Sequence, residues 1–157
     1  MTHRTEKSAE IMVIDDTFES LQLLVGILRD KGYRLRPANS GKIALASIKV
    51  RRPDLILLDV RMPGMDGFEV CQKLKADPNT KKIPVVFVTA LDEVKDTIRG
   101  FELGGADFIT KPFQPEEVIA RVNNQLEMLF LRQELEQSNE SLNKEIQQQK
   151  KTEYDIV

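Results

Sequence analysis

The sequence predicts an α/β fold with a parallel sheet, and two features of the pattern indicate it. Short apolar segments alternate with longer segments whose apolar residues recur at helical spacing. This order is typical of βαβ units with helices on both faces of the sheet. The segment Leu55–Leu58 consists of large aliphatic residues without alternation and runs directly into Asp59. Such a run is typical of a strand that is buried on both faces.

The first strand and helix follow a lead-in, residues 1–9, which has no pattern and is predicted to be flexible. Ile11–Ile14 is a short apolar strand that ends at Asp15 and Asp16. The helix after it is predicted to stop at Gly32, because glycine commonly ends helices. Its expected inner face contains Phe18, Leu21, Leu24, Val25, Ile27 and Leu28.

The next two elements are a weaker strand at Tyr33–Pro37 and a helix that begins after Asn39 and Ser40. Side chains of these two types cap helices well, because they accept hydrogen bonds from free backbone N–H groups. The inner face of this helix is predicted to contain Ile43, Ala44, Leu45 and Ile48.

The remaining elements of the sheet follow the central strand. Ile83–Thr89 is predicted as a fourth strand, residues 92–103 as a helix that ends at Gly104, and Asp107–Thr110 as a short fifth strand. Before them, a third helix is predicted from the apolar residues Phe68, Val70, Cys71 and Leu74.

The segment from Glu116 to Val157 contains no glycine or proline in 42 residues, which favours one long helix. Its first part is apolar enough to pack on the domain. Beyond Leu131 the apolar stripe narrows to Leu135, Leu142 and Ile146, which with Asn139 follow the four-and-three spacing of a coiled coil.

In this register Asn139 and Ile146 occupy heptad positions of type a, and a lone asparagine at such a position typically favours a dimer. We therefore divide the chain into a lead-in (1–9), a domain (10–130) and a C-terminal helix (131–157) that is predicted to form a coiled coil. A solvated single helix or a disordered tail is the alternative for this last segment.

The composition excludes several classes of protein. The 157 residues carry 23 basic and 25 acidic side chains, so the protein has no net positive charge that would favour binding to nucleic acid or to an anionic membrane. The segment after Phe113 is acidic, which argues against nucleic-acid contacts. No apolar run reaches the roughly 18 to 20 residues of a membrane span. The single cysteine, Cys71, excludes an internal disulfide and suits a cytoplasmic protein.

Three carboxylates are predicted to meet at one edge of the sheet. Asp15 and Asp16 end the first strand and Asp59 ends the central strand, so they converge if these strands are neighbours. Like charges about 4 Å apart repel by about 4 kcal/mol at an effective dielectric near 20, which favours a bound cation. Ligands that are all oxygen select Mg²⁺ or Mn²⁺, and Mg²⁺ commonly binds beside phosphate oxygens. The pattern therefore predicts a metal site that also receives a phosphoryl group.

Two further strand ends carry suitable side chains. Thr89 offers a hydroxyl before the small residue Ala90, and Lys111 offers an ammonium group suited to a phosphoryl oxygen. With a carboxylate nucleophile and a divalent cation, these groups complete the requirements of phosphoryl transfer. Taken singly, each residue also has a structural explanation, such as a strand threonine, a surface lysine, or a helix cap formed by Asp16 with Glu19.

Other motifs fail. The segment Asn39–Lys42 is similar to the end of a P-loop, but Ile43 stands where Ser or Thr must bind Mg²⁺. His3 is the only histidine and lies in the lead-in, so no zinc site, Ser-His-Asp triad or phosphodonor histidine is expected in the domain. The phosphoryl group must therefore come from another protein or domain.

The order and spacing of these residues resemble the receiver domain of two-component response regulators. The resemblance covers roughly residues 9–130 and rests on Asp15-Asp16, the segment Asp59–Gly67, Thr89-Ala90 and Lys111-Pro112-Phe113. It implies a CheY-like, flavodoxin-like fold. This is a doubly wound parallel sheet of five strands in the order 2-1-3-4-5, here with an extended C-terminal helix.

The resemblance also implies how the acidic residues act. Asp59 would be the phosphoacceptor. Mg²⁺ would be held by the side chains of Asp15, Asp16 and Asp59 and by the backbone carbonyl of Arg61.

The same resemblance gives Thr89 and Lys111 the role of sensing the phosphoryl group. Phe108 matches the switch aromatic of the family, which swings inward when Thr89 moves toward the phosphate. A fixed core phenylalanine is the alternative. A cis peptide bond between Lys111 and Pro112 is also implied, and X-Pro bonds adopt this form at low cost.

Arg61 and Leu91 lie two residues after the phosphoacceptor and the threonine, at positions that vary within the family. Both are bulky and would stand near the path of an attacking water. Our hypothesis is that they slow the loss of the phosphoryl group.

The expected function is a phospho-acceptor signalling switch in a two-component phosphorelay. A histidine kinase or phosphotransfer protein would donate to Asp59, and the domain would catalyse its own phosphorylation and dephosphorylation without being a turnover enzyme. The change would be relayed through helix 92–103, strand 107–110 and the start of the helix after residue 115. We expect a homodimer through the C-terminal helix and this face, and an output module beyond Val157.

Two other functions are compatible with the same residues. The first is a Mg²⁺-dependent phosphohydrolase with an aspartate nucleophile, although Arg61 stands where a general acid is usual. The second is a coiled-coil dimerisation scaffold whose receiver domain is silent.

Overall fold

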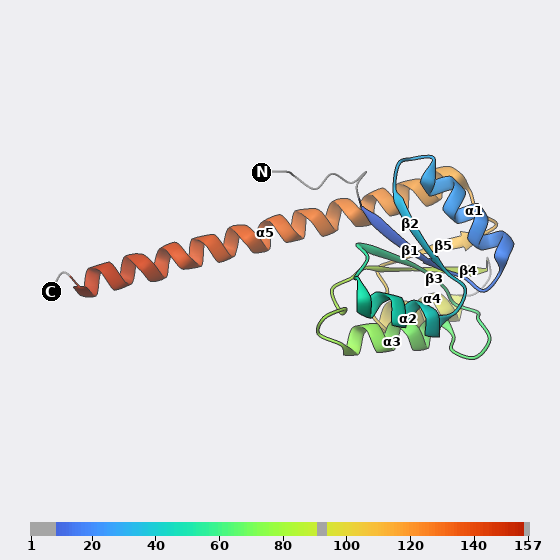
Figure 1. The fold of residues 1–157 in the computed structure, drawn as a ribbon, viewed down its shortest axis with the longest axis horizontal. Helices are drawn as coiled ribbons and strands as arrows, with labels where there is room; N and C mark the ends of the chain where they lie inside the picture. Colours follow the sequence, from blue (N-terminus) through green and yellow to red (C-terminus); the bar gives the residue numbers. More distant parts are fainter. Residues whose placement is uncertain (1–8, 91–93, 156–157) are drawn as a thin grey trace. The chain divides into compact units, whose positions relative to one another are not determined.

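The computed structural model describes residues 9–90 and 94–155. The chain divides into two compact units, Met1–Leu126 and Glu127–Val157. The first unit contains one sheet of 5 strands in the order β2-β1-β3-β4-β5, and every neighbouring pair is parallel (Figure 1). The predicted fold class and strand order are therefore confirmed.

Strands and helices alternate along the chain as expected. The strands are β1 (Glu10–Ile14), β2 (Arg34–Ala38), β3 (Leu55–Asp59), β4 (Val85–Ala90) and β5 (Asp107–Lys111). The helices are α1 (Phe18–Arg29), α2 (Gly41–Val50), α3 (Gly67–Ala76), α4 (Val94–Glu102) and α5 (Pro115–Asp155). Where the predicted bounds fall on described residues, they agree to within three residues. The predicted start of α4 at residue 92 and the predicted end of α5 at residue 157 lie outside the described residues. Lys111 proves to be the last residue of β5 instead of following it.

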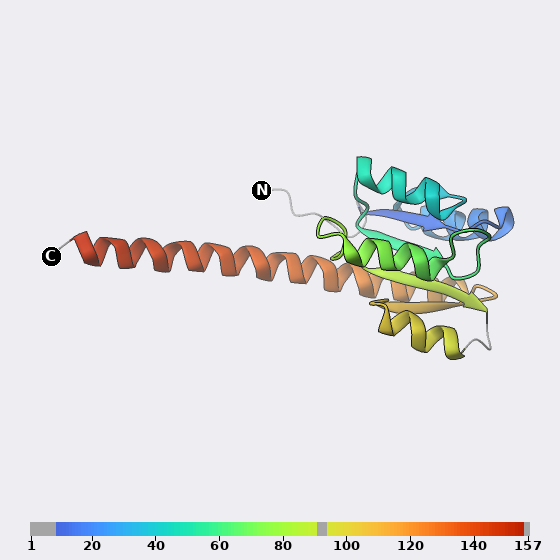
Figure 2. The ribbon, with the colours of Figure 1, turned by 90° about the horizontal axis from the view of Figure 1, so that it is seen from below.

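The sheet is buried on both faces, because helices cover each side. Figure 2 shows α2 and α3 in front of the sheet, with α1 and the first turns of α5 behind it. Successive strand residues point to opposite faces. The core under α2 and α3 is formed by Met12, Ile14, Ile56, Leu58, Val85, Phe87, Ala44, Ile48, Phe68, Val70, Cys71 and Leu74. The residues between them in the strands are equally buried and include Ile11, Val13, Leu55, Leu57, Val86 and Val88.

Two predicted core residues are exposed instead. Phe18 keeps 73% of its surface exposed because it is the first residue of α1 and lies beyond the carboxyl ends of the strands. Ile43 is 55% exposed. The buried stripe of α2 contains Ala44 and Ile48, and Ile43 lies about 100° around the helix from Ala44. The remaining predicted core of α1 is buried or half-buried.

The helix caps are partly as predicted. Ser40 caps α2, and its side chain accepts a hydrogen bond from the backbone N–H of Ile43 at 3.2 Å. The cap position of α1 is Thr17 and not Asp16, and no side chain caps that helix. Asp16 is therefore available for another role.

The second unit is the remainder of α5, a single helix. From residue 131 onward every side chain described, up to residue 152, is exposed. The exposed large apolar residues of this unit are Met128, Leu131, Leu135, Leu142 and Ile146. The predicted a and d residues therefore form a stripe that nothing in the described part of the chain covers.

Candidate functional site

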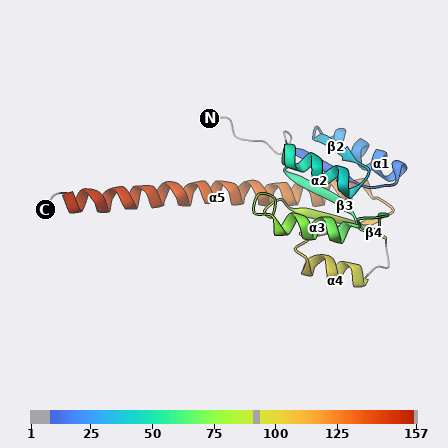
Figure 3. The same ribbon diagram turned by 60° about the horizontal axis from the view of Figure 1, so that its bottom comes forward.

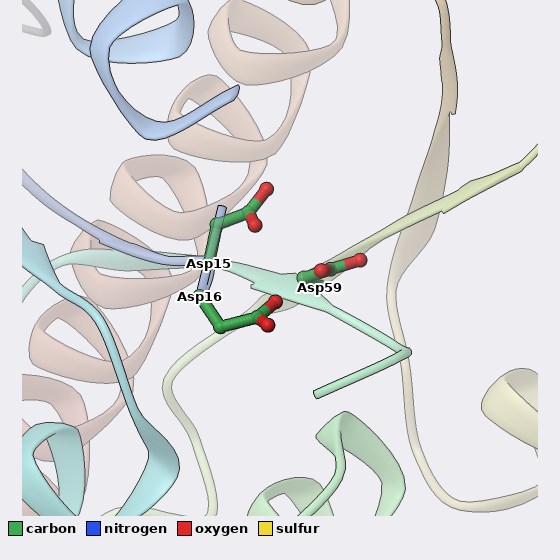
Figure 4. Close-up of side chains that lie close together, drawn as sticks. All are labelled: Asp15, Asp16 and Asp59. Atoms are coloured by element: carbon green, nitrogen blue, oxygen red, sulfur yellow. The ribbon is translucent and has the colours of Figure 1, made fainter. Parts of the chain in front are cut away.

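The carboxylates of Asp15, Asp16 and Asp59 gather at the carboxyl ends of two neighbouring strands (Figure 4). β1 pairs with β3 in parallel up to Ile14 and Leu58, so the residues that follow lie side by side. One carboxylate oxygen from each of the three lies within 4.8 Å of the others. The convergence expected from the sequence is present in the structure.

Burial makes this cluster electrostatically unfavourable without a cation. Asp15 is 1% exposed and Asp59 is 4% exposed, whereas Asp16 is open to solvent. Burial and the neighbouring Asp15 raise the pKa of Asp59 from 3.8 to about 7, and the charge of Lys111 acts in the opposite direction. The site therefore favours a proton or a cation beside these carboxylates.

The loop after Asp59 is held close to the strand end by a glycine. A Cβ atom on Gly67 would lie 2.2 Å from the carbonyl oxygen of Asp59, so no larger residue fits there. Asp66 caps α3 by accepting a hydrogen bond from the N–H of Glu69 at 2.9 Å. The start of α3 thus fixes the backbone on the carboxyl side of Asp59.

Lys111 faces the cluster from the end of β5. Its Nζ atom lies 3.3 Å from Oδ2 of Asp15 and 3.7 Å from Oδ1 of Asp59. The peptide bond between Lys111 and Pro112 is cis, as the resemblance to receiver domains implied. One ammonium group therefore contacts two carboxylates, which leaves part of the negative charge uncompensated.

Two buried oxygen atoms at the site accept or donate no hydrogen bond within the described residues. They are Oδ2 of Asp15 and the hydroxyl oxygen of Thr89. Oδ1 of Asp15, in contrast, accepts a hydrogen bond from the N–H of Thr17 at 2.9 Å. Buried polar atoms are usually satisfied, so these two point to a missing ligand.

The donor set fits Mg²⁺. The three carboxylates supply only oxygen, which is the ligand type that this cation prefers. Oδ2 of Asp15 accepts no hydrogen bond within the described residues, although Nζ of Lys111 lies 3.3 Å from it, and this oxygen can therefore act as a metal ligand. A divalent ion also compensates the charge of three carboxylates better than the single ammonium of Lys111 does.

Arg61 directs its side chain toward α4. Its Nη2 atom lies 2.6 Å from Oδ2 of Asp96, a residue that sequence reasoning missed. The only indication in the sequence was the position of Asp96, four residues before Gly100 on the predicted helix. This spacing places Asp96 and Gly100 on one face of the helix. The hypothesis that pairs Arg61 with Leu91 falls partly outside the described residues, because residues 91–93 are not described.

Phe108 lies inward, at 7% exposure. Its ring stacks on Phe87 at 5.4 Å between centroids and contacts Phe101 of α4 at 5.0 Å. Its role as a switch stays a prediction.

Among the residues that the structure describes, no helix is long and apolar enough to cross a membrane.

The sequence was compared with protein families and with individual proteins. Residues 11–123 match the family described as the response regulator receiver domain. Response regulator PleD of Caulobacter vibrioides is 46% identical over 134 residues, which are 85% of this chain and 30% of PleD. DNA-binding response regulator MtrA of Mycobacterium tuberculosis is 40% identical over 116 residues, 74% of this chain and 50% of MtrA. The chain thus spans half or less of these relatives.

Solved structures give the same result. Chemotaxis response regulator CheY4 of Vibrio cholerae superposes with a TM-score of 0.71 at 29% identity, covering 75% of this chain and 98% of CheY4. The receiver domain of NtrX from Brucella abortus superposes with a TM-score of 0.71 at 32% identity, covering 74% and 98% of the two chains. The family match covers most of the chain, and the strand order and acidic cluster agree with it. The chain belongs to the response regulator receiver domain family.

Proposed function

We propose that this chain is a phospho-acceptor switch in which Asp59 receives a phosphoryl group from the phosphohistidine of a histidine kinase or phosphotransfer protein. Receiver domains of response regulators act in two-component phosphorelay signalling, which is the general frame for this proposal. The observation that carries it is the cluster of Asp15, Asp16 and Asp59 facing Lys111 at one sheet edge.

Each residue has a defined part in the proposed transfer. A carboxylate oxygen of Asp59 attacks phosphorus, the phosphorus–nitrogen bond breaks, and its electron pair returns to the donor imidazole. Lys111 neutralises charge on the transferred oxygens, and the free hydroxyl of Thr89 donates a hydrogen bond to one of them. Hydrolysis reverses the state, as water attacks phosphorus and the carboxylate of Asp59 leaves.

Asp15, Asp16 and Asp59, with the backbone carbonyl of Arg61, would hold Mg²⁺. When bound, this ion supplies positive charge that stabilises the oxygens of the transferring phosphoryl group. Binding of the ion also favours ionised Asp59, the form that can act as a nucleophile, over the protonated form that its raised pKa favours.

The test is the intact mass of the protein after incubation with acetyl phosphate and MgCl₂. We expect one phosphoryl adduct that requires Mg²⁺ and is lost in Asp59→Asn. The matched control is Asp54→Asn, because Asp54 is also buried but precedes β3 at the opposite end of the sheet. Its adduct should form at the normal rate.

Other outcomes distinguish the alternatives. No adduct in the wild type would overturn the switch and favour the scaffold. Repeated turnover of small phosphate esters would favour the phosphohydrolase.

For the C-terminal helix we propose a parallel, in-register homodimer through Leu135, Asn139, Leu142 and Ile146. In this arrangement Asn139 meets its own copy, whereas an antiparallel pair would bury its amide against an apolar residue. Glu145 at a g position then faces Lys150 at the e position of the partner helix. The exposed residues Val94, Ile98 and Phe101 of α4 offer a second self-contact next to β5.

Charge reversal tests the helix orientation. Glu145→Lys and Lys150→Glu should each weaken the dimer in sedimentation experiments, and the double variant should restore it, because the attractive pair is rebuilt with opposite polarity. A double variant that remains as weak as the single ones would contradict the parallel register. Relatives in this family carry output domains, and we propose that the dimer sets the spacing of one that follows this segment.

A further inference from the structure

The helix α4 is held to the domain in an unusual way. Its buried residues are Asp96 and Gly100, whereas its large apolar residues Val94, Ile98 and Phe101 are more than half exposed. A surface helix normally buries an apolar stripe. Here a carboxylate occupies that stripe, so the attachment of α4 depends strongly on how the charge of Asp96 is compensated.

The compensating group comes from the loop that follows the phosphoacceptor. Nη2 of Arg61 lies 2.6 Å from Oδ2 of Asp96, and the two side chains are 68% and 10% exposed. A buried carboxylate requires its partner cation, because removing one partner leaves an uncompensated charge. The exposed guanidinium has no such requirement, because water solvates it when it leaves. The pair is therefore asymmetric: Asp96 needs Arg61 more than Arg61 needs Asp96.

Arg61 is also within reach of the phosphorylation site. Its Cα atom lies at most about 7.6 Å from that of Asp59, since each peptide step spans about 3.8 Å. A phosphoryl group on Asp59 would add a charge of about −1.5 to −2 and three strong acceptor oxygens. A guanidinium binds such a group through two parallel hydrogen bonds, more strongly than it binds a single carboxylate oxygen.

We propose that Arg61 is a shared cation that pairs with Asp96 in the unphosphorylated protein and transfers to the phosphoryl group when Asp59 is phosphorylated. This inference rests on the proposed function of Asp59. Asp96 is then a positioning residue, because it acts on the site only through Arg61.

The exchange has a direct consequence for α4. Once Arg61 leaves, Asp96 is a buried charge without its cation, and α4 must move or open to hydrate it. Figure 3 shows α4 at the end of the helical layer that it forms with α2 and α3, so it can move without displacing another helix. The phosphoryl charge is thereby converted into a change in the helix that carries the exposed apolar stripe.

Amide hydrogen exchange of α4, measured by mass spectrometry with and without acetyl phosphate and MgCl₂, tests this proposal. In the wild type we expect phosphorylation to speed exchange in Val94–Glu102. In Arg61→Gln we expect exchange in α4 to be faster already without the phosphoryl group, by roughly 2- to 30-fold, and to change little on phosphorylation. In Asp96→Asn the uncharged helix should exchange slowly in both states.

Asp96→Asn also has an effect that a purely structural role would not produce. Because Arg61 then leaves no buried charge behind, we expect phosphorylation by acetyl phosphate to be faster by roughly 2- to 30-fold. Arg61→Lys should retain part of the wild-type response, because it keeps the charge but not the two-pronged geometry.

The matched control is Arg51→Gln. Arg51 is 65% exposed and pairs at 2.7 Å with Glu10, whose side chain is 9% exposed, at the opposite end of the sheet. This variant should show the wild-type response of α4. A response of wild-type size in Arg61→Gln, with a normal adduct on Asp59, would overturn the shared cation and leave the proposed function intact. No adduct in the wild type would overturn both, because Arg61 would have no phosphoryl group to bind.

Discussion

The helices α3 and α4 cover the same face of the sheet, yet they are held by different kinds of contact. α3 buries Phe68, Val70, Cys71 and Leu74 against the core. α4 buries one carboxylate and one glycine and leaves its large apolar residues exposed. Apolar burial is not directional and does not depend on charge, so α3 is expected to stay in place when the site changes its charge. α4 is held by contacts that a nearby charge can alter.

This difference divides the site into two parts. The strands β1 and β3, with the start of α3, hold the carboxylates in a fixed position. The residues beside α4, Arg61 and Phe108, contact it through an ion pair and a ring contact. In the proposed function the stable part would bind the phosphoryl group and the less firmly held part would respond, an arrangement that is suited to a switch.

The largest expected effect is on the apolar attachment of α3. Phe68→Ala should lower the free energy of unfolding by about 3 to 5 kcal/mol, because this ring is 1% exposed and its removal leaves a cavity. Ile98→Ala on α4 is the control and should change it by less than about 0.5 kcal/mol, since Ile98 is 55% exposed. Urea denaturation measures both. Equal losses in the two variants would remove the contrast between the helices.

The next largest effect concerns the charge of Asp59 in the stable part of the site. Because the pKa of Asp59 is raised from 3.8 to about 7, the folded protein binds this proton more tightly than the unfolded chain does. The stabilisation is complete below pH 3.8 and is lost as the pH rises through about 7, at most about 4 kcal/mol in the absence of a divalent cation.

Urea denaturation between about pH 5 and pH 8 measures this loss, and Asp59→Asn should make the profile flatter. Adding MgCl₂ at the higher pH should restore stability to the wild type, because the ion binds the folded site. The variant should gain less. A profile for Asp59→Asn as steep as that of the wild type would assign the pH dependence to other groups.

A smaller effect is expected where α4 lies against the sheet. A Cβ atom on Gly100 would lie 2.4 Å from Phe108 and 3.0 Å from Phe87, so Gly100→Ala should destabilise the protein by about 1 to 3 kcal/mol. Gly26→Ala in α1 is the matched control, because nothing lies within 4 Å of its added methyl group. There the better helix propensity of alanine should stabilise the protein by up to about 1 kcal/mol. Thermal unfolding of both variants shows whether each one is stabilised or destabilised. A stabilised Gly100→Ala would show that α4 can be displaced without loss of stability.

The smallest effect on stability is expected at Thr89. Its buried hydroxyl has no hydrogen-bond partner within the described residues, so Thr89→Val should leave the metal-free protein unchanged or more stable by up to about 1 kcal/mol. Thr80→Val is the contrast on the α3 side, because the Thr80 hydroxyl donates to the carbonyl of Leu74 at 2.7 Å. Its loss should cost about 1 to 3 kcal/mol.

The effect of the two substitutions on the response to phosphorylation should have the opposite order. Thr89→Val should lose the response of α4 to acetyl phosphate, whereas Thr80→Val should keep it at a temperature where it is folded. A Thr89→Val variant that is strongly destabilised and still responds would place the hydroxyl in the core and not in the site.

Much of this arrangement was predictable from particular residues. The run Leu55–Leu58 identified a strand buried on both faces, and Asp59 at its end was placed at the carboxyl edge by the parallel topology. The same rule placed Asp15 and Asp16 at this edge, because they follow the end of β1. The core residues of α3 were predicted correctly, because its large apolar residues recur at helical spacing and all lie on the buried face.

Other features depended on contacts between segments distant in sequence. Phe18 has the spacing of a core residue, but it is the first residue of α1 and lies beyond the strand ends, which periodicity does not show. The pairing of Arg61 with Asp96 joins residues 35 positions apart, and neither residue type indicates its partner.

By itself the sequence determined the order of the elements, the parallel sheet and the acids at its carboxyl edge. These follow from local apolar periodicity and from the chirality of βαβ connections, which act on every sequence in the same way. Only the tertiary structure decided which oxygens remain without a hydrogen bond, how far the pKa of Asp59 rises and which cation compensates Asp96. These properties depend on distances of a few ångströms between side chains from different elements and on the exclusion of water between them, and no local pattern encodes either.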